Sequence, residues 1–283
     1  MLQKPAGFHE FLGKAFAVKK GGTMTEIKAF IFDQDGVIID TEKDGHLVAF
    51  NETFKAFGYD FTWDVDEYHE LLQISGGKER MRHYLHTKGF GVEVNSEEED
   101  ELIKTLHKHK TELFIDLLEG DKLPLRAGVK RLMQEVNAAG LVLGICTTSN
   151  QRSVHAVSTK ILKDIRFDFV LAGDVVSKKK PDPEIYNLAL EQTGYKPEEC
   201  VVIEDSRNGV LAAHQAGMYI VATTNFYTQR EDLSLADIIV TSLGDPEGET
   251  GTLVAGGEGL DYTGVLHARH LADYFSRQAP SPD

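Results

Sequence analysis

Short runs of consecutive apolar residues recur along the chain, and helical patterns separate most of them. Such runs are typical of strands that are buried on both faces of a parallel sheet. The predicted strands are Ile27–Phe32, Leu141–Cys146, Phe167–Ala172, Cys200–Ile203, Tyr219–Ala222 and Asp237–Val240. The helices predicted between them are Val129–Ala139, Arg152–Leu162, Pro183–Thr193 and Asn208–Ala216. Strands that alternate with helices predict right-handed βαβ units and an open parallel sheet, which is an α/β fold.

The stretch 41–119 interrupts this alternation, because its periodicity is helical throughout. The helices predicted there are Gly45–Phe57, Val65–Leu72, Lys78–Thr87 and Glu97–Leu118. We therefore expect a smaller helical domain over 41–119, inserted into a main domain made of 27–40 and 120–283. Residues 1–26 are an N-terminal extension in this division. The last segment, LHARHLADYF, predicts a packed terminal helix.

Composition narrows the classes of partner. Among the 283 residues, 30 Lys and Arg stand against 45 Asp and Glu, so the formal net charge is −15. This charge argues against general binding to nucleic acid or to anionic membranes, but not against an anionic small substrate. No apolar run is long enough for a transmembrane helix. We expect a monomer that acts on a small molecule.

Location is predicted from the cysteines and from the first residues. Cys146 and Cys200 lie in apolar runs outside any CxxC motif, which is typical of buried free thiols in a reducing compartment. The first 23 residues lack the apolar core of a secretory signal, contain no Arg and include Glu10. We expect a cytoplasmic protein, or one of the plastid stroma if the host is a photosynthetic eukaryote.

Polar segments follow several of the predicted strands. Asp33-Gln34-Asp35-Gly36 follows the first strand, and Cys146-Thr147-Thr148-Ser149-Asn150 follows the next one along the chain. Ligands of such sheets bind at the carboxyl ends of the strands, where one carboxylate can attack while another transfers a proton. Hydroxyl and backbone N–H groups at a helix start can hold phosphate oxygens. Taken singly, the first segment is also compatible with an Asp-rich turn, and the second with a plain helix N-cap at Ser149 or Asn150.

Two further polar segments come later in the chain. Lys178-Lys179-Lys180-Pro181-Asp182-Pro183 precedes a predicted helix, and Glu204-Asp205-Ser206 follows a predicted strand. An ammonium group can balance a phosphoryl group, and adjacent acids favour a cation, for which oxygen ligands select Mg²⁺. A solvated basic loop and a helix cap are the alternatives. Taken together, the four segments supply the groups for Mg²⁺-assisted phosphoryl transfer.

The same segments resemble those of a known family. FIFDQDGVIIDTE, CTTSN, KKKPDPEIY and VVIEDSRNG are similar to the four ordered motifs of the haloacid dehalogenase superfamily. DTEKDGHLVAFNETF, ISGGKERM and GDVVSKKKPDPEIYNLAL resemble its CbbY branch, which is similar to β-phosphoglucomutase in fold and is associated with hydrolysis of xylulose 1,5-bisphosphate. The resemblance implies a Rossmann-like parallel-sheet core with a small inserted helical cap domain. Gln34 stands where the family usually has an apolar residue, and we expect it to point away from the chemistry.

The resemblance implies roles for the carboxylates. Asp33 attacks phosphorus and forms an aspartyl-phosphate. Asp35 protonates the leaving sugar oxygen and then activates water. Asp33, the backbone carbonyl of Asp35 and Asp205 hold Mg²⁺, and Glu204 assists directly or through water.

Other motif residues are expected to hold the phosphoryl group. The resemblance implies that Thr147 binds the transferred group and that Lys180, which directly precedes a proline, neutralises its charge. Ser149 and Asn150 are candidates for substrate contacts at the same helix start. Phosphoryl transfer depends mostly on positioning and charge neutralisation, so these groups suit the reaction.

The predicted cap domain offers further candidates. Glu42 and His46 lie where the chain enters the cap, and we expect them to bind sugar hydroxyls or to orient the proton-transferring carboxylate. Lys78 and Arg80 in GGKER are expected to bind a second phosphate. The alternatives are a helix-face histidine and a solvated helix start. We interpret the run His107-Lys108-His109-Lys110 as a solvated helix face.

Two other functions compete with a sugar-bisphosphate phosphatase. A phosphosugar mutase similar to β-phosphoglucomutase uses the same Asp33 and Asp35, and it differs in passing the phosphoryl group to another sugar instead of water. A catalytically silent binding protein would be expected to lack Asp33, Asp35 or Asp205, and all three are present. The cap residues that resemble those of the CbbY branch favour hydrolysis, with Mg²⁺ as cofactor.

Overall fold

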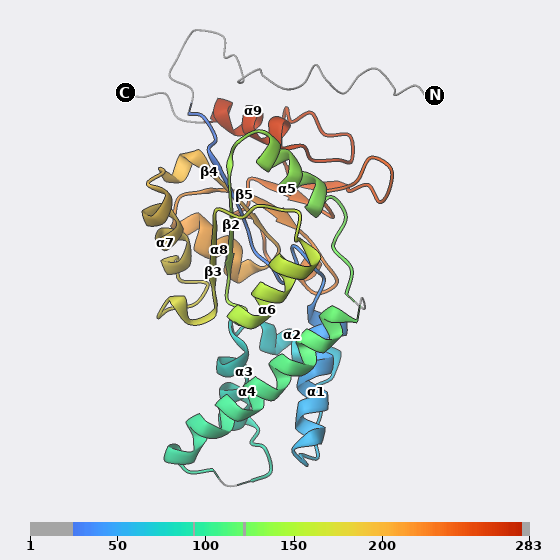
Figure 1. The fold of residues 1–283 in the computed structure, drawn as a ribbon, viewed down its shortest axis with the longest axis vertical. Helices are drawn as coiled ribbons and strands as arrows, with labels where there is room; N and C mark the ends of the chain where they lie inside the picture. Colours follow the sequence, from blue (N-terminus) through green and yellow to red (C-terminus); the bar gives the residue numbers. More distant parts are fainter. Residues whose placement is uncertain (1–24, 93, 121–122, 279–283) are drawn as a thin grey trace.

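The computed structural model describes residues 25–92, 94–120 and 123–278. These residues form one seven-stranded sheet in the order β3-β2-β1-β4-β5-β6-β7, and β7 pairs antiparallel with β6 while the other pairs are parallel (Figure 1). The strands are β1 Ala29–Phe32, β2 Val142–Thr147, β3 Phe169–Ala172, β4 Cys200–Glu204, β5 Tyr219–Thr223, β6 Ile238–Val240 and β7 Leu253–Gly256. All six predicted strands are present, and the predicted Rossmann-like α/β fold is confirmed.

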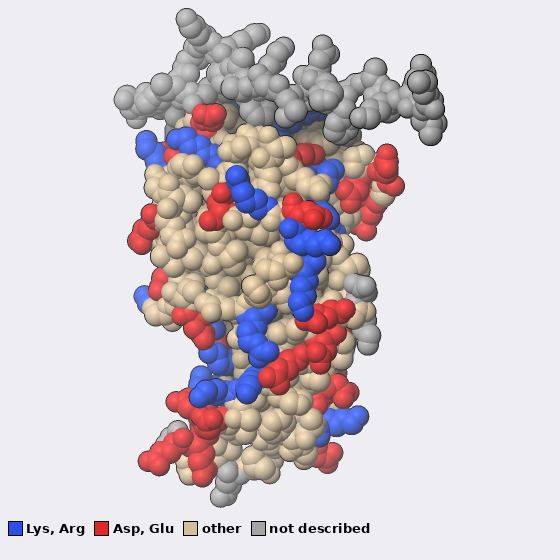
Figure 2. Space-filling view, in the orientation of Figure 1, with Lys and Arg blue, Asp and Glu red and all other residues tan. Residues whose placement is uncertain are grey.

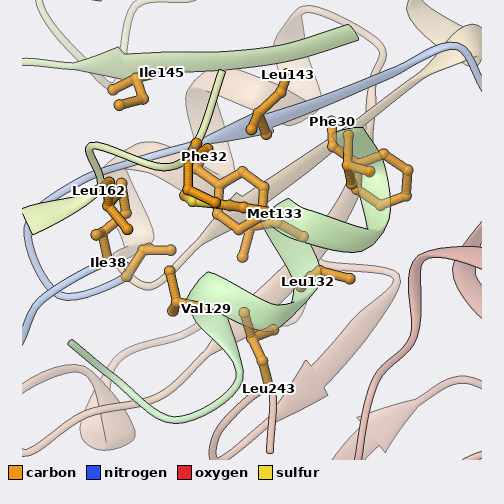
Figure 3. Close-up of a cluster of buried hydrophobic side chains, with 14 of the residues drawn as sticks. Phe30, Phe32, Ile38, Val129, Leu132, Met133, Leu143, Ile145, Leu162 and Leu243 are labelled. Atoms are coloured by element: carbon orange, nitrogen blue, oxygen red, sulfur yellow. The ribbon is translucent and has the colours of Figure 1, made fainter. Parts of the chain in front are cut away.

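Helices cover both faces of the sheet. The central strands β1 and β4 are therefore buried along their whole length. On one face, α5 packs Leu132 and Met133 against Phe30 and Phe32 of β1 (Figure 3). On the other face, α7 and α8 cover a second apolar cluster that includes Tyr186. The helices of this core are α5 Val129–Ala138, α6 Gln151–Ala156, α7 Glu184–Thr193, α8 Arg207–Gln215 and α9 Ala268–Gln278.

The C-terminal region differs from the sequence prediction. It contains the predicted terminal helix α9, and it also adds the strand β7 to the edge of the sheet. The sequence does not predict β7, because the strand is short, Gly-flanked and exposed and has no buried apolar face. Almost all of the predicted N-terminal extension, residues 1–24, lies outside the described residues.

Among the described residues, four α-helices lie between β1 and α5, and we call the stretch 41–119 the helical insert (Figure 1). They are α1 Leu47–Ala56, α2 Val65–Leu72, α3 Gly77–Thr87 and α4 Ser96–Glu119. Large side chains, among them Phe50, Phe54, Trp63 and Tyr68, form a separate apolar cluster within it. These four helices agree with the predicted ones, because their apolar positions recur at helical spacing.

The helical insert is joined to the core at two adjacent segments. Ile39, on the outgoing segment, forms an antiparallel bridge with Leu125 on the returning one. The backbone N–H of Arg126 donates to the carbonyl of Ile38 at 3.0 Å. At the C-terminal end of α4, Phe114 and Leu118 pack into the apolar cluster of the core. Both connections therefore leave the sheet beside the carboxyl end of β1.

The surface carries charges of both signs. On the face drawn in Figure 2, Asp and Glu side chains gather over the helical insert, with Lys and Arg side chains beside them. Within the described residues, no helix combines the length and apolar character that crossing a membrane requires.

Candidate active site

The motif residues meet at the carboxyl edge of three neighbouring strands. Asp33 follows β1, Thr147 ends β2 and Glu204 ends β4. Because β1 pairs with both β2 and β4, residues far apart in the sequence come together at this edge. The arrangement places ligand-binding side chains where parallel α/β sheets usually bind their ligands.

Three buried carboxylates form the centre of the site. One oxygen from each of Asp33, Glu204 and Asp205 lies within 4.8 Å of the others, and the three residues are 8%, 0% and 5% exposed. Burial, followed by the charge of Glu204, raises the pKa of Asp33 to about 8 in spite of Lys180. Burial and the charges of Glu204 and Asp33 hold the pKa of Asp205 well above its usual range. The three carboxylates therefore repel one another, and their oxygen donors fit a hard divalent cation such as Mg²⁺.

Lys180 supplies the buried positive charge of the cluster. Its ammonium group donates to Asp33 Oδ1 at 2.7 Å, to Glu204 Oε1 at 2.6 Å and to the Cys146 carbonyl at 2.9 Å. Burial opposes its charge, but Asp33 and Glu204 raise the pKa of Lys180 above its usual value. Lys180 therefore stays protonated and neutralises one of the carboxylates.

The other two lysines of the motif have different surroundings. Lys178 is exposed and lies 3.8 Å from Asp182, and Lys179 pairs with Glu79 and Asp174. Lys180 is thus the member of the run that reaches Asp33, because it lies directly before the helix-starting segment that packs against β2 and β4.

Asp35 is held by hydrogen bonds from both the core and the helical insert. Its Oδ1 accepts from Thr41 Oγ1 at 2.7 Å and lies 3.2 Å from His46 Nε2, and its Oδ2 accepts from Ser149 Oγ. Burial opposes the charge of Asp35, but His46 and these hydrogen bonds lower its pKa below the usual range. In this arrangement Asp35 is ionised and able to accept a proton.

The entry to the helical insert brings two predicted residues into the site. Residues 42–46 form one turn of π-helix, in which Glu42 and His46 are the first and last residues. Glu42 Oε2 accepts from Tyr68 Oη at 2.6 Å, and His46 Nδ1 lies 2.7 Å from Lys110 Nζ. If the ammonium group of Lys110 donates to Nδ1, the proton of His46 is on Nε2 and faces Asp35.

Two pockets meet over these side chains. One contains the acidic cluster, with Asp33, Thr147, Lys180 and Asp205 in its wall. The other contains His107, Lys110 and Thr111 of α4. The residues that line both pockets are Asp35, Glu42, Gly76, Arg80 and Thr148. The site therefore has a carboxylate end on the core and a basic end on the helical insert.

The residues of the second motif take several roles. Thr147 is 1% exposed, and its Oγ1 accepts from the backbone N–H of Ser149 at 3.1 Å. Asn150 caps α6 by accepting from Arg152 N at 2.9 Å, which is the alternative that the sequence left open, and it also lines the basic pocket. Asn150 thus combines a structural and a site position.

The two candidates in GGKER do not behave alike. The ammonium group of Lys78 lies 2.5 Å from Asp174 Oδ2 on the core, and Lys78 is in the wall of neither pocket. Asp174 takes up the charge of Lys78 in this arrangement, and binding of a second phosphate by Lys78 stays a prediction. Arg80 lines both pockets, although its guanidinium also donates to the Leu71 carbonyl and to Tyr68 Oη, each at 3.0 Å.

Our interpretation of 107–110 as a solvated face is wrong for two of its members. Lys110 is 6% exposed and His107 is half-buried, and both line the basic pocket. Burial lowers the pKa of Lys110 to about 7, and burial with the charge of Lys110 lowers the pKa of His107 to about 3. Their spacing of three residues places them on one face of α4, and that spacing was the available signal.

Sequence reasoning also missed partners of the carboxylates. Tyr186 Oη donates to Glu204 Oε1 at 2.7 Å, and Asn225 Nδ2 donates to Asp205 Oδ2 at 2.6 Å. Tyr186 is part of the KKKPDPEIY motif, so its sequence signal was present. Asn225 follows β5, and its position after a predicted strand was its signal.

Comparisons with known proteins identify the family of this chain. A family model described as haloacid dehalogenase-like hydrolase matches residues 27–217. A CBBY-like protein of Arabidopsis thaliana is 48% identical over 78% of this chain and 70% of its own length. Beta-phosphoglucomutase of Bacillus subtilis is 28% identical over 77% of this chain and 91% of its own length.

A solved structure also relates this chain to the CbbY proteins. The crystal structure of a CbbY mutant from Rhodobacter sphaeroides in complex with xylulose-(1,5)bisphosphate is 37% identical, with a TM-score of 0.71, and covers 83% of this chain and 100% of that one. The residues of the carboxylate end, from Asp33 to Asp205, all lie within the stretch that the family model matches. The chain therefore belongs to the haloacid dehalogenase-like hydrolases, as a phosphatase related to the CbbY proteins and, more distantly, to β-phosphoglucomutase.

Proposed function

We propose that this protein hydrolyses a sugar bisphosphate, foremost xylulose 1,5-bisphosphate, with Mg²⁺ and through an aspartyl-phosphate on Asp33. The observation that carries the proposal is the two-ended pocket. Asp33 and Lys180 lie at one end, Lys110 lies at the other, and Arg80 lines both. A substrate with one phosphate at each end suits this distribution of charge.

The carboxylate end holds the phosphate that is cleaved. Mg²⁺, bound by Asp33, Asp205 and the backbone carbonyl of Asp35 with Glu204 assisting, would neutralise charge on the phosphoryl group and on the carboxylates. Lys180 neutralises further charge, and Thr147 holds a phosphoryl oxygen. Asp33 then attacks phosphorus, and the bond between phosphorus and the sugar oxygen breaks.

Asp35 transfers protons in both steps. An anionic phosphoryl group beside Asp35 raises its affinity for a proton. Protonated Asp35 gives that proton to the leaving sugar oxygen. Once ionised, Asp35 takes a proton from the water that attacks the aspartyl-phosphate, and inorganic phosphate leaves. The hydrogen bonds from Thr41 and Ser149 keep the carboxyl group of Asp35 oriented for both transfers.

The basic end is proposed to select the substrate. Lys110 and Arg80 bind the distal phosphate, and His107 and Asn150 complete the wall around it. Glu42 and His46 lie between the two ends and contact sugar hydroxyls. In this proposal the helical insert over 41–119 is a cap domain that excludes water until the aspartyl-phosphate has formed.

The test is phosphate release from a panel of compounds in the presence of Mg²⁺. The panel contains xylulose 1,5-bisphosphate, ribulose 1,5-bisphosphate, β-glucose 1-phosphate and 2-phosphoglycolate. We expect the highest kcat/KM for xylulose 1,5-bisphosphate. Isomerisation of β-glucose 1-phosphate without net phosphate release would instead identify a mutase. The monomeric state and the cytoplasmic or plastid-stromal location stay predictions.

A further inference from the structure

The loop after β5 contacts Asp205, one of the proposed metal ligands. Asn225 Nδ2 donates to Asp205 Oδ2 at 2.6 Å. The other side-chain atom, Asn225 Oδ1, accepts from the backbone N–H groups of Tyr227 at 3.0 Å and of Thr228 at 3.1 Å. Because two backbone donors bind Oδ1, the orientation of the amide is settled, and its NH₂ group faces the carboxylate.

Asp205 has little room to move away from this contact. Gly36 has a φ of +81°, and a Cβ atom placed on it would lie 2.1 Å from Asp205 Oδ2 and 2.8 Å from Asn225 Nδ2. The backbone at Gly36 thus lies directly against both groups. The position of the Asp205 carboxylate is therefore set by Asn225 on one side and by the loop after β1 on the other.

The same short segment also contacts the helical insert. Tyr227, two residues after Asn225, is 2% exposed and belongs to the apolar cluster of the insert. Its ring centroid lies 6.1 Å from that of Tyr68 and 5.5 Å from that of His69, both on α2. Four residues further on, Glu231 accepts from Gln73 Nε2 at 3.1 Å. One end of this segment therefore binds a metal ligand, and the other packs on the insert.

We propose that Asn225 is a positioning residue for Asp205, and that Tyr227 links this positioning to docking of the helical insert. Docking of the insert and binding of a divalent cation then favour each other. By thermodynamic linkage, the factor by which docking strengthens cation binding equals the factor by which the cation strengthens docking. This inference rests on the proposed metal site at Asp33, Glu204 and Asp205.

The physical reason lies in the geometry of the loop. When the insert is docked, the Tyr227 ring is fixed among aromatic side chains, and the backbone N–H of Tyr227 is fixed with it. That N–H orients the Asn225 amide, which in turn orients Asp205. When the insert is undocked, the Tyr227 ring loses these neighbours, and the amide loses its fixed direction. A ligand that is not oriented binds a metal more weakly.

The experiment measures Mg²⁺ binding to the substrate-free full-length protein by isothermal titration calorimetry. Asn225→Ser keeps a hydroxyl that accepts from the loop backbone, but it removes the donor to Asp205. We expect it to raise the Kd for Mg²⁺ by about tenfold. Tyr227→Leu should raise the Kd by about fivefold. The double variant should match Asn225→Ser alone, because the link to Asp205 is already broken.

The matched control is Leu235→Ala, at an apolar residue of the same connection between β5 and β6. Leu235 is 41% exposed and belongs to none of the apolar clusters, so the Kd of this variant should equal that of the wild type. Thermal unfolding of each variant in EDTA checks that the variants are folded, and hydrogen exchange of α2 with and without Mg²⁺ reports docking directly. We expect Mg²⁺ to slow exchange in α2 of the wild type and not of Tyr227→Leu.

The outcomes separate this inference from the proposed function. A wild-type protein that binds no Mg²⁺ overturns the metal site and the inference with it. Wild-type binding that Asn225→Ser leaves unchanged overturns the positioning role alone. If Tyr227→Leu also raised the Kd for Mg²⁺ fivefold in the Asn225→Ser background, the two residues would act independently. That result would overturn the link between docking and cation binding.

Discussion

The core and the helical insert supply opposite ends of one pocket, and they place their charged groups by different means. On the core, Asp33, Thr147 and Glu204 stand at the ends of paired parallel strands, so the register of the sheet fixes their separation. On the insert, Lys110 and Arg80 lie on helices that contribute to its apolar cluster, and both cations lie over the ring of Phe50.

This difference explains why the residues of one end of the pocket are easier to predict from the sequence than those of the other. A strand end is marked locally, since an apolar run is followed at once by the polar residues that do the chemistry. A helix face is marked only by spacing, and its direction depends on how the helix packs. The carboxylate end therefore appears as compact motifs, whereas the basic end is dispersed over α3 and α4.

The sharpest test of the carboxylate end is Asp33→Asn. An amide in place of the carboxylate cannot attack phosphorus, so we expect phosphate release to fall by about 10³-fold or more. Steady-state kinetics with p-nitrophenyl phosphate and with xylulose 1,5-bisphosphate measures this loss. Asp182→Asn, in the lysine motif but outside the acidic cluster, should retain activity. Activity that persisted in Asp33→Asn would refute the nucleophile assignment.

The acidic cluster should also make the folding stability of the metal-free protein depend on pH. Burial and Glu204 raise the pKa of Asp33 to about 8 from 3.8, so its proton is held more tightly in the folded state. The stability that this group contributes is full below about pH 4 and is lost as the pH rises through 8. Since one pKa unit corresponds to about 1.4 kcal/mol, we expect a loss of a few kcal/mol.

Urea unfolding in EDTA between about pH 5 and pH 8 measures that loss. The free energy of unfolding should fall more steeply with pH for the wild type than for Asp33→Asn, which cannot ionise at this position. Saturating Mg²⁺ should remove much of the difference, because the cation neutralises the carboxylate. Parallel curves for the two proteins in EDTA would contradict the raised pKa.

The basic end is tested by Lys110→Met, which keeps the length of the side chain and removes its charge. We expect KM for the bisphosphate to rise by about tenfold to a hundredfold, the usual effect of losing a hydrogen bond to a charged group. KM for p-nitrophenyl phosphate, which has no distal phosphate, should change much less. Lys108→Met, at an exposed position of the same helix, is the matched control. An equal rise in KM for both substrates would count against a distal-phosphate site.

A smaller effect is expected at Gln34, beside the nucleophile. Its side chain is fully buried, and both its amide N and O lack a hydrogen-bond partner among the described residues. Gln34→Leu removes these groups and should raise the free energy of unfolding by about 1 to 3 kcal/mol in urea. Gln192→Leu, at an exposed position of α7, should change it by less than about 0.5 kcal/mol. A destabilised Gln34→Leu protein would indicate that the amide is satisfied.

Much of the architecture follows from local patterns. Six strands, the helices between them and the four helices of the insert were predicted, because buried strands and amphipathic helices have distinct periodicities. The strand β7 was not predicted, since an exposed edge strand has no buried face to mark it. The sequence predicts only that Gln34 points away from the chemistry, and its burial without a hydrogen-bond partner among the described residues is a property of the packed structure.

The sequence by itself determined the identity of the carboxylate end, since each group there directly follows or ends an apolar strand and parallel strands share one edge. Tertiary structure decided that Lys78 pairs with Asp174 and that Lys110 is buried against His46. Each of these contacts joins segments that are far apart in the sequence, and packing between distant segments leaves no pattern in either segment alone.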